Sequence, residues 1–181
     1  MKKSLVMVLL LAFGLSGTAA LVLEIGKGKA SPDLTDGAVG LLGRPAGQQD
    51  VLPAKLLSTP AAKFVDSGGA RLSQVDGGEA LFAAPSTDGG ICLVVALDQD
   101  DTPMSCGTRD LLKQSALYIS VPSGTGTGVD VYGLVGDGVS TAGAVNVFNN
   151  TFVIRGLTSP SVPIAGSAGE ATLDLSASLT P

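Results

Sequence analysis

One apolar run, Ile91-Cys92-Leu93-Val94-Val95-Ala96-Leu97, says most about the fold of this 181-residue chain. The run is too short for a typical helix and rich in β-branched residues, and Gly-Gly precedes it while Asp98 follows it. A continuous apolar run of this length between turn signals is typical of a strand buried on both faces. We therefore expect a sheet with this strand at its centre.

Other short β-rich runs lie on either side of it. Val129–Val135 places Val129, Val131 and Val135 on one face, and 145–148 and 151–154 flank Asn149-Asn150, a pair that suits a tight hairpin. The run 171–175 alternates and is expected to form an edge strand. Turn signals recur at 67–69, 76–78, 88–90 and 137–138. This pattern predicts a mainly β domain over 61–181, an antiparallel sandwich or partly open barrel.

Helical signals are few. Thr108 is a good N-cap for one short helix over 109–115. Residues 26–60 are rich in Gly and Pro and are expected to be a linker, with a short helix near 36–42. Within that linker, the part from Arg44 to Pro53 either floats or docks on the domain.

The N-terminus has the features of a membrane-targeting segment. Lys2 and Lys3 precede 20 uncharged residues, 4–23, which as a helix would span roughly 30 Å. The segment, taken as 1–25, is expected to be an uncleaved signal anchor. A cleaved signal peptide cut after the small residues 17–20 and a buried core helix are the alternatives. The first two place the rest of the chain outside the cytoplasm, in the anchored case as a single-pass protein with its C-terminal domain outside.

The charge distribution bears on partners. Lys+Arg 11 against Asp+Glu 16 gives a net charge of −5, and from residue 31 onward 7 basic and 15 acidic residues give −8. Nucleic acid is therefore an unsuitable partner, because a phosphate backbone requires a basic surface. Anionic lipid headgroups would also repel such a domain, so we expect it to stand off the membrane surface.

Cys92 and Cys106 are the two cysteines of the chain. Two cysteines in one small exported domain usually pair, and the turn between them would centre near residue 99. The acidic residues Asp98, Asp100 and Asp101 would then form the tip of the hairpin, a candidate interaction site. A free, reactive or metal-binding cysteine pair is the alternative.

The sequence contains no recognisable catalytic or metal-binding motif. The chain has no histidine, which excludes Ser-His-Asp and Cys-His sites and histidine-liganded metals. The tip lacks the glycine and the closing glutamate of a calcium loop. Asp130 and Asp137 could be posed as an acid/base pair, although aspartates at strand ends are ordinarily turn formers. We assign no catalytic, cofactor-binding or metal-binding residue.

Several motifs together resemble a known group of proteins. They are Arg44-Pro45 with Leu52-Pro53, Gly90-Ile91-Cys92-Leu93, Ser105-Cys106-Gly107, Gly133-Leu134-Val135-Gly136-Asp137-Gly138-Val139 and Asn149-Asn150-Thr151-Phe152. The chain resembles, over roughly 40–155, a group of uncharacterised exported or membrane-anchored proteins of high-GC Gram-positive bacteria. It departs from them in Gly136, where proline is expected, and in its long tail. The resemblance implies a location and a fold, and no activity.

The function that these observations favour is a non-enzymatic envelope module outside the cytoplasm. It would support structure or bind an envelope protein or wall polymer, and the N-terminal helix would hold it at the membrane. The alternatives are a secreted inhibitor or ligand released by signal cleavage, which would present the acidic tip, and a hydrolase that uses Ser or Asp without His.

Overall fold

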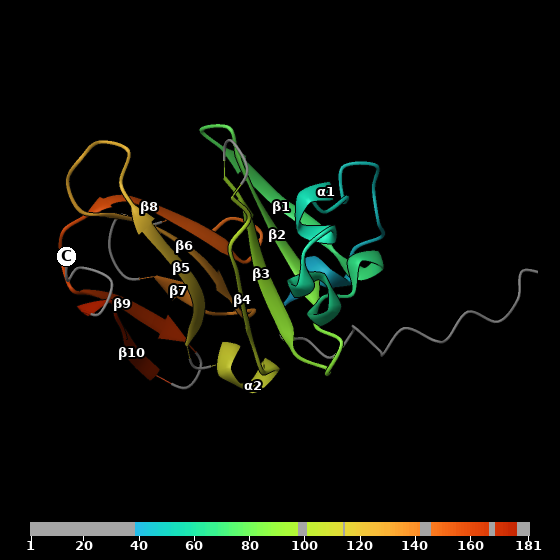
Figure 1. The fold of residues 1–181 in the computed structure, drawn as a ribbon. Helices are drawn as coiled ribbons and strands as arrows, with labels where there is room; N and C mark the ends of the chain where they lie inside the picture. The colour runs from blue at the N-terminus through green and yellow to red at the C-terminus, as the bar shows by residue number, and fades with distance from the viewer. Residues whose placement is uncertain (1–38, 98–100, 114, 142–145, 167–168, 177–181) are drawn as a thin grey trace, which may run out of the picture. The chain divides into compact units, whose positions relative to one another are not determined.

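The computed structural model describes residues 39–97, 101–113, 115–141, 146–166 and 169–176, which form three antiparallel sheets (Figure 1). The first sheet has the order β1-β2-β3-β4, the second β5-β6-β8 and the third β10-β9-β7. Their strands are β1 (Arg71–Asp76), β2 (Glu79–Pro85), β3 (Ile91–Ala96), β4 (Met104–Gly107), β5 (Ala116–Pro122), β6 (Val129–Val135), β7 (Ser140–Thr141), β8 (Thr151–Leu157), β9 (Ser161–Gly166) and β10 (Gly169–Asp174). The expected mainly β, antiparallel fold is confirmed.

Strand β3 is buried on both faces, as its unbroken apolar sequence predicts. Leu93 and Val95 point into a cluster between the first and second sheets, whereas Cys92 and Val94 point to the opposite face of the first sheet. Successive side chains of a strand point to opposite faces, so only a strand covered on both sides can be apolar throughout. β6 is the second such strand, and all seven of its residues are buried.

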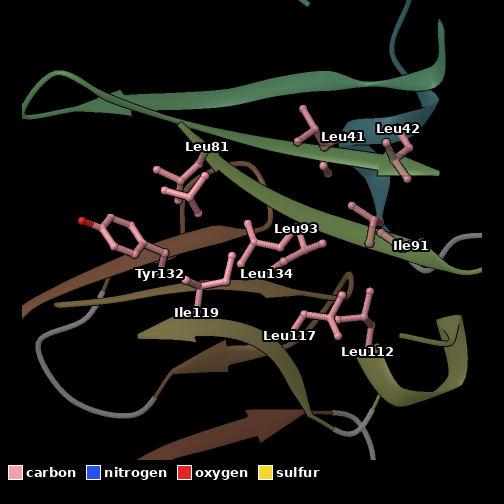
Figure 2. Packing of buried hydrophobic residues seen from close by; sticks show 13 residues of the cluster. Leu41, Leu42, Leu81, Ile91, Leu93, Leu112, Leu117, Ile119, Tyr132 and Leu134 are labelled. Carbon is pink, nitrogen blue, oxygen red and sulfur yellow. The ribbon is translucent and has the colours of Figure 1, made fainter. Parts of the chain in front are cut away.

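Side chains from both sheets build the core between them (Figure 2). Leu81 and Leu93 from the first sheet lie toward Ile119, Tyr132 and Leu134 from the second. Two short elements close one end of this core: the 3-10 turn η1 (Gly40–Gly43) supplies Leu41 and Leu42, and α2 (Arg109–Leu112) supplies Leu112. The face-to-face packing is that of a sandwich.

The other face of the second sheet packs on the third. Val129, Val131 and Val135 share this face, as predicted, and lie with Phe152 and Ile164 in one buried cluster. The expected edge strand near 171–175 is confirmed as β10, the outer strand of the third sheet.

A layer of short elements covers the outer face of the first sheet. It consists of α1 (Ala54–Leu57), η2 (Pro60–Phe64) and η3 (Ser67–Gly69), which lie beside β1 and β2 (Figure 1). Leu52, Leu56 and Val65 of this segment are buried against the sheet. From Val39 onward, the stretch interpreted as a linker is therefore part of the packed unit, and the part from Arg44 to Pro53 docks on the sheet.

One ion pair also ties this segment to the free edge of β1. Arg44 binds Asp50 through two hydrogen bonds, at 2.8 and 2.6 Å. The pair also takes up the outward backbone groups of Leu72, because Asp50 accepts from its N–H at 2.7 Å and Arg44 donates to its carbonyl at 2.8 Å. An exposed strand edge invites pairing with another chain, and these side chains occupy it.

The local sequence signals for a helix cap and a tight turn are confirmed, although the helix has a different end. Thr108 caps α2 by accepting from the Leu111 N–H at 3.3 Å, but the helix ends at Leu112, earlier than expected. Asn149 and Asn150 form a tight turn with φ of 44° and 66°, and the Phe148–Thr151 bridge closes it. α1 is a second short helix that the sequence did not suggest.

The N-terminal segment 1–25 lies outside the described residues. Within those that are described, no helix has both the length and the apolar character to span a membrane.

Candidate functional site

A pocket of about 400 Å³ lies where the first sheet meets α2. One wall is the loop 86–90 between β2 and β3, and the other is the turn from Cys106 to Asp110 that joins β4 to α2. Both walls lie at the same end of the β3–β4 pair, because Ile91 pairs with Gly107.

Two glycines and the disulfide hold the two walls close together. A Cβ atom on Gly90 would collide with the carbonyl oxygen of Gly107, and one on Gly107 would lie 2.8 Å from a methyl carbon of Leu117. The Cys92–Cys106 disulfide joins the next pair of residues along the ladder, which confirms the predicted pairing. Cys106 lines the pocket, whereas Cys92 is fully buried. A crosslink and close backbone packing therefore hold the two walls in place.

The loop 86–90 is organised by Asp88. Its carboxylate accepts hydrogen bonds from the Ser86 hydroxyl and from the Gly90 N–H, and these two bonds lower the pKa of Asp88 below its usual range. A carboxylate with a lowered pKa is a weak base, so it is poorly suited to activate the Ser86 hydroxyl as a nucleophile. The pair stabilises a turn and leaves Asp88 ionised at the pocket rim.

Arg109 and Asp110 complete the charged rim from the α2 side. Asp110 binds Lys113 at 2.9 Å, one turn further along the helix. Arg109, which is half-buried, forms no ion pair or hydrogen bond with any other residue that the structure describes. A guanidinium without an internal partner is available for an anionic group of a ligand.

Asp101, one residue of the predicted acidic tip, lies at the other end of the β3–β4 pair. Its carbonyl accepts from the Leu97 N–H at 3.0 Å. Asp101 is exposed, and Asp98 and Asp100 lie outside the described residues.

Asp130 and Asp137 have separate structural roles. Asp137 accepts hydrogen bonds from the Gly40 N–H and from the Asn150 amide, both at 2.8 Å, and so holds η1 in place. Asp130 accepts from the Gly156 N–H at 2.8 Å and from Arg155 at 3.3 Å. Burial opposes ionisation of Asp130, but hydrogen bonds from Gly156, Ser123 and Arg155 outweigh it and lower its pKa.

Arg155 is the centre of the largest charged cluster in the described part of the chain. Its guanidinium contacts Asp76 at 2.7 Å, Glu79 at 2.5 Å and Asp130 at 3.3 Å, and it donates to the Tyr132 hydroxyl at 2.8 Å. It also lies 5.3 Å from the centre of the Tyr132 ring. The cluster joins the β1–β2 turn to β6 and β8, so it connects two sheets.

Sequence reasoning missed both the pocket and this cluster. Arg155 and Asp76 are 79 residues apart, and the pocket walls come from separate turns. The local sequence gives little indication of the pocket. Asp88-Gly89-Gly90 by itself predicts only a turn, and Gly107-Thr108 only the start of a helix.

No group of three or more potential metal ligands is present among the described residues. Comparison of the chain with protein-family models, with curated proteins and with solved structures finds no match.

Proposed function

We propose that this chain is a non-catalytic binding module that works outside the cytoplasm, with the pocket beside the disulfide as its ligand site. The observation that carries the proposal is the pocket itself, a concave site of about 400 Å³ next to a disulfide, with Arg109, a cation that has no partner among the described residues, on its rim. The disulfide supports the location, because such bonds persist mainly in oxidising compartments. The apolar segment 4–23 is proposed as its membrane anchor.

The pocket lining indicates a hydrated, polar ligand. Apart from the disulfide, the walls present glycines, hydroxyls and charged groups rather than the apolar side chains that line most small-molecule sites. The carboxylates of Asp88 and Asp110 can accept hydrogen bonds from sugar hydroxyls, and Arg109 can bind a carboxylate or phosphate. A wall polymer with acidic groups has this chemistry.

The test is titration of the full-length protein, in detergent, with soluble glycan fragments of bacterial cell wall that bear free carboxylates, followed by calorimetry. We expect binding, and we expect Arg109→Gln to weaken it roughly tenfold or more, because one charged hydrogen bond is lost. Lys55→Gln removes the same charge from α1 and should leave the affinity unchanged. Equal affinities of the wild type and Arg109→Gln would refute the assignment of the pocket.

The same samples distinguish the hydrolase alternative. Incubated fragments are analysed by mass spectrometry, and a binding module should leave their masses unchanged. Cleavage that Ser86→Ala abolishes would replace the binding proposal with an enzymatic one.

A further inference from the structure

The layer that covers the first sheet has an unusual outer surface. Val51, Leu57 and Phe64 are 67%, 44% and 53% exposed, although the same segment buries Leu52 and Leu56 on its inner side. Half of the six large apolar side chains that are exposed in the described structure therefore come from 14 consecutive residues, 51–64. Exposed apolar groups gathered on one layer commonly mark a contact surface.

The charge of this segment is opposite to that of the rest of the domain. Residues 51–65 contain Lys55 and Lys63 and no acidic residue, whereas the chain from residue 31 onward carries a net charge of −8. Lys63 places its ammonium group 4.9 Å from the centre of the Phe64 ring. On either side of this segment, Asp50 binds Arg44 and Asp66 accepts from the Gly68 N–H. We call residues 51–64 the basic apolar face.

We propose that the basic apolar face docks on the surface of an anionic lipid bilayer. Apolar side chains flanked by lysines are the combination that binds membrane interfaces, because the apolar groups enter the acyl boundary while the ammonium groups remain among anionic headgroups. The inference rests on the membrane anchoring in the proposed function. It replaces the expectation, drawn from net charge alone, that the domain stands off the membrane.

The length of the chain between anchor and domain permits this contact. The 15 residues 24–38 separate the apolar segment 4–23 from Val39, the first described residue. At no more than about 3.5 Å per residue, they span at most roughly 50 Å. A tether of this length keeps the domain close to the bilayer, so that a weak interfacial contact has a high effective concentration.

The chain offers a matched pair of reporters, because it contains no tryptophan. Phe64 lies on the basic apolar face, and Phe148, 55% exposed, lies in the Asn149-Asn150 turn beside β1. Full-length Phe64→Trp and Phe148→Trp are reconstituted into vesicles of phosphatidylcholine, with or without phosphatidylglycerol, that carry brominated acyl chains. Flotation of the vesicles reports anchoring separately from docking.

In anionic vesicles we expect the Phe64→Trp emission to shift to the blue and to be largely quenched, while Phe148→Trp stays unquenched. Adding Lys55→Gln and Lys63→Gln to Phe64→Trp should return its emission to that seen in phosphatidylcholine alone. If the protein floats with the vesicles but the two tryptophans are quenched equally, or neither is quenched, docking is refuted. The proposed anchor and the proposed pocket are not affected by that result. If the protein does not float with the vesicles, both docking and the anchor are refuted. The glycan titration tests the pocket independently of this experiment.

Discussion

At the scale of single residues, Gly133 lies directly against the ring of Phe152. The two residues are direct partners across β6 and β8, and a Cβ atom on Gly133 would overlap the buried Phe152 ring. The ring fills the space that a side chain would occupy, on the face of β6 that packs toward the third sheet. A glycine within a strand marks such close approaches.

Gly133→Ala should therefore lower the free energy of unfolding by about 1–3 kcal/mol, the usual cost of overpacking a core. Gly124→Ala is the control, because nothing lies within 4 Å of a Cβ atom there and its φ is not positive. Urea unfolding of both variants measures the difference. Phe152→Leu should recover part of the loss in the Gly133→Ala background, and a loss equal to that of Gly124→Ala would contradict the assigned contact.

At the scale of elements, the edge of β1 depends on the docked segment before it. Asp50 has a side chain that is 1% exposed, and it accepts hydrogen bonds from Arg44, Gly47 and Leu72. Burial alone would raise the pKa of Asp50, but these hydrogen bonds outweigh burial and lower the pKa to about 2. The folded state therefore holds the ionised carboxylate more firmly than the unfolded chain does.

This difference predicts a pH dependence. A carboxyl group whose pKa falls from 3.8 to about 2 on folding stabilises the fold by about 2 kcal/mol above pH 4, and this contribution is lost as the pH falls through 2. Asp50→Asn should lower the free energy of unfolding by at least that amount at pH 7, and its deficit relative to the wild type should shrink toward pH 2. Urea unfolding of the wild type and Asp50→Asn at several pH values measures this deficit.

Asp101→Asn, at an exposed site, is the control and should match the wild type at pH 7. A deficit of Asp50→Asn that does not change between pH 7 and pH 2 would show that the carboxylate charge is not the stabilising feature.

At the scale of the whole domain, Arg155 connects the first and second sheets. It is the common partner of Asp76 and Glu79 from one sheet and of Asp130 and Tyr132 from the other. The Glu79 carboxylate, and after it Asp76, raise the pKa of Arg155 against the effect of burial. Without the guanidinium, three carboxylates would face one another with no cation between them.

Arg155→Ala should lower the free energy of unfolding by about 1–3 kcal/mol, since partly buried charges lose their partner. Arg155→Lys should recover only part of this, because one ammonium cannot match a planar guanidinium with several acceptors. Lys113→Ala removes an exposed pair with Asp110 and should cost much less than Arg155→Ala, because solvent screens exposed pairs. Chemical denaturation compares all three, and similar small losses for Arg155→Ala and Lys113→Ala would contradict the connecting role.

Local sequence is enough to predict the features that depend on neighbouring residues. The apolar run at β3, the valine face of β6, the Thr108 cap and the Asn149-Asn150 turn all follow from local periodicity and backbone preference. The Cys92–Cys106 pair belongs here as well, because a hairpin with an acidic turn near residue 99 brings the two residues opposite each other.

Contacts between segments that lie far apart in the chain could not be predicted from local sequence. Sheet stacking brings Arg155 to Asp76, the Leu72 backbone to Asp50, and the loop 86–90 to the start of α2. Each contact forms because the sheets stack to bury their apolar faces. The polar residues that stacking brings together have no pattern in their local sequence that identifies them as partners. The pocket and the basic apolar face are consequences of that packing.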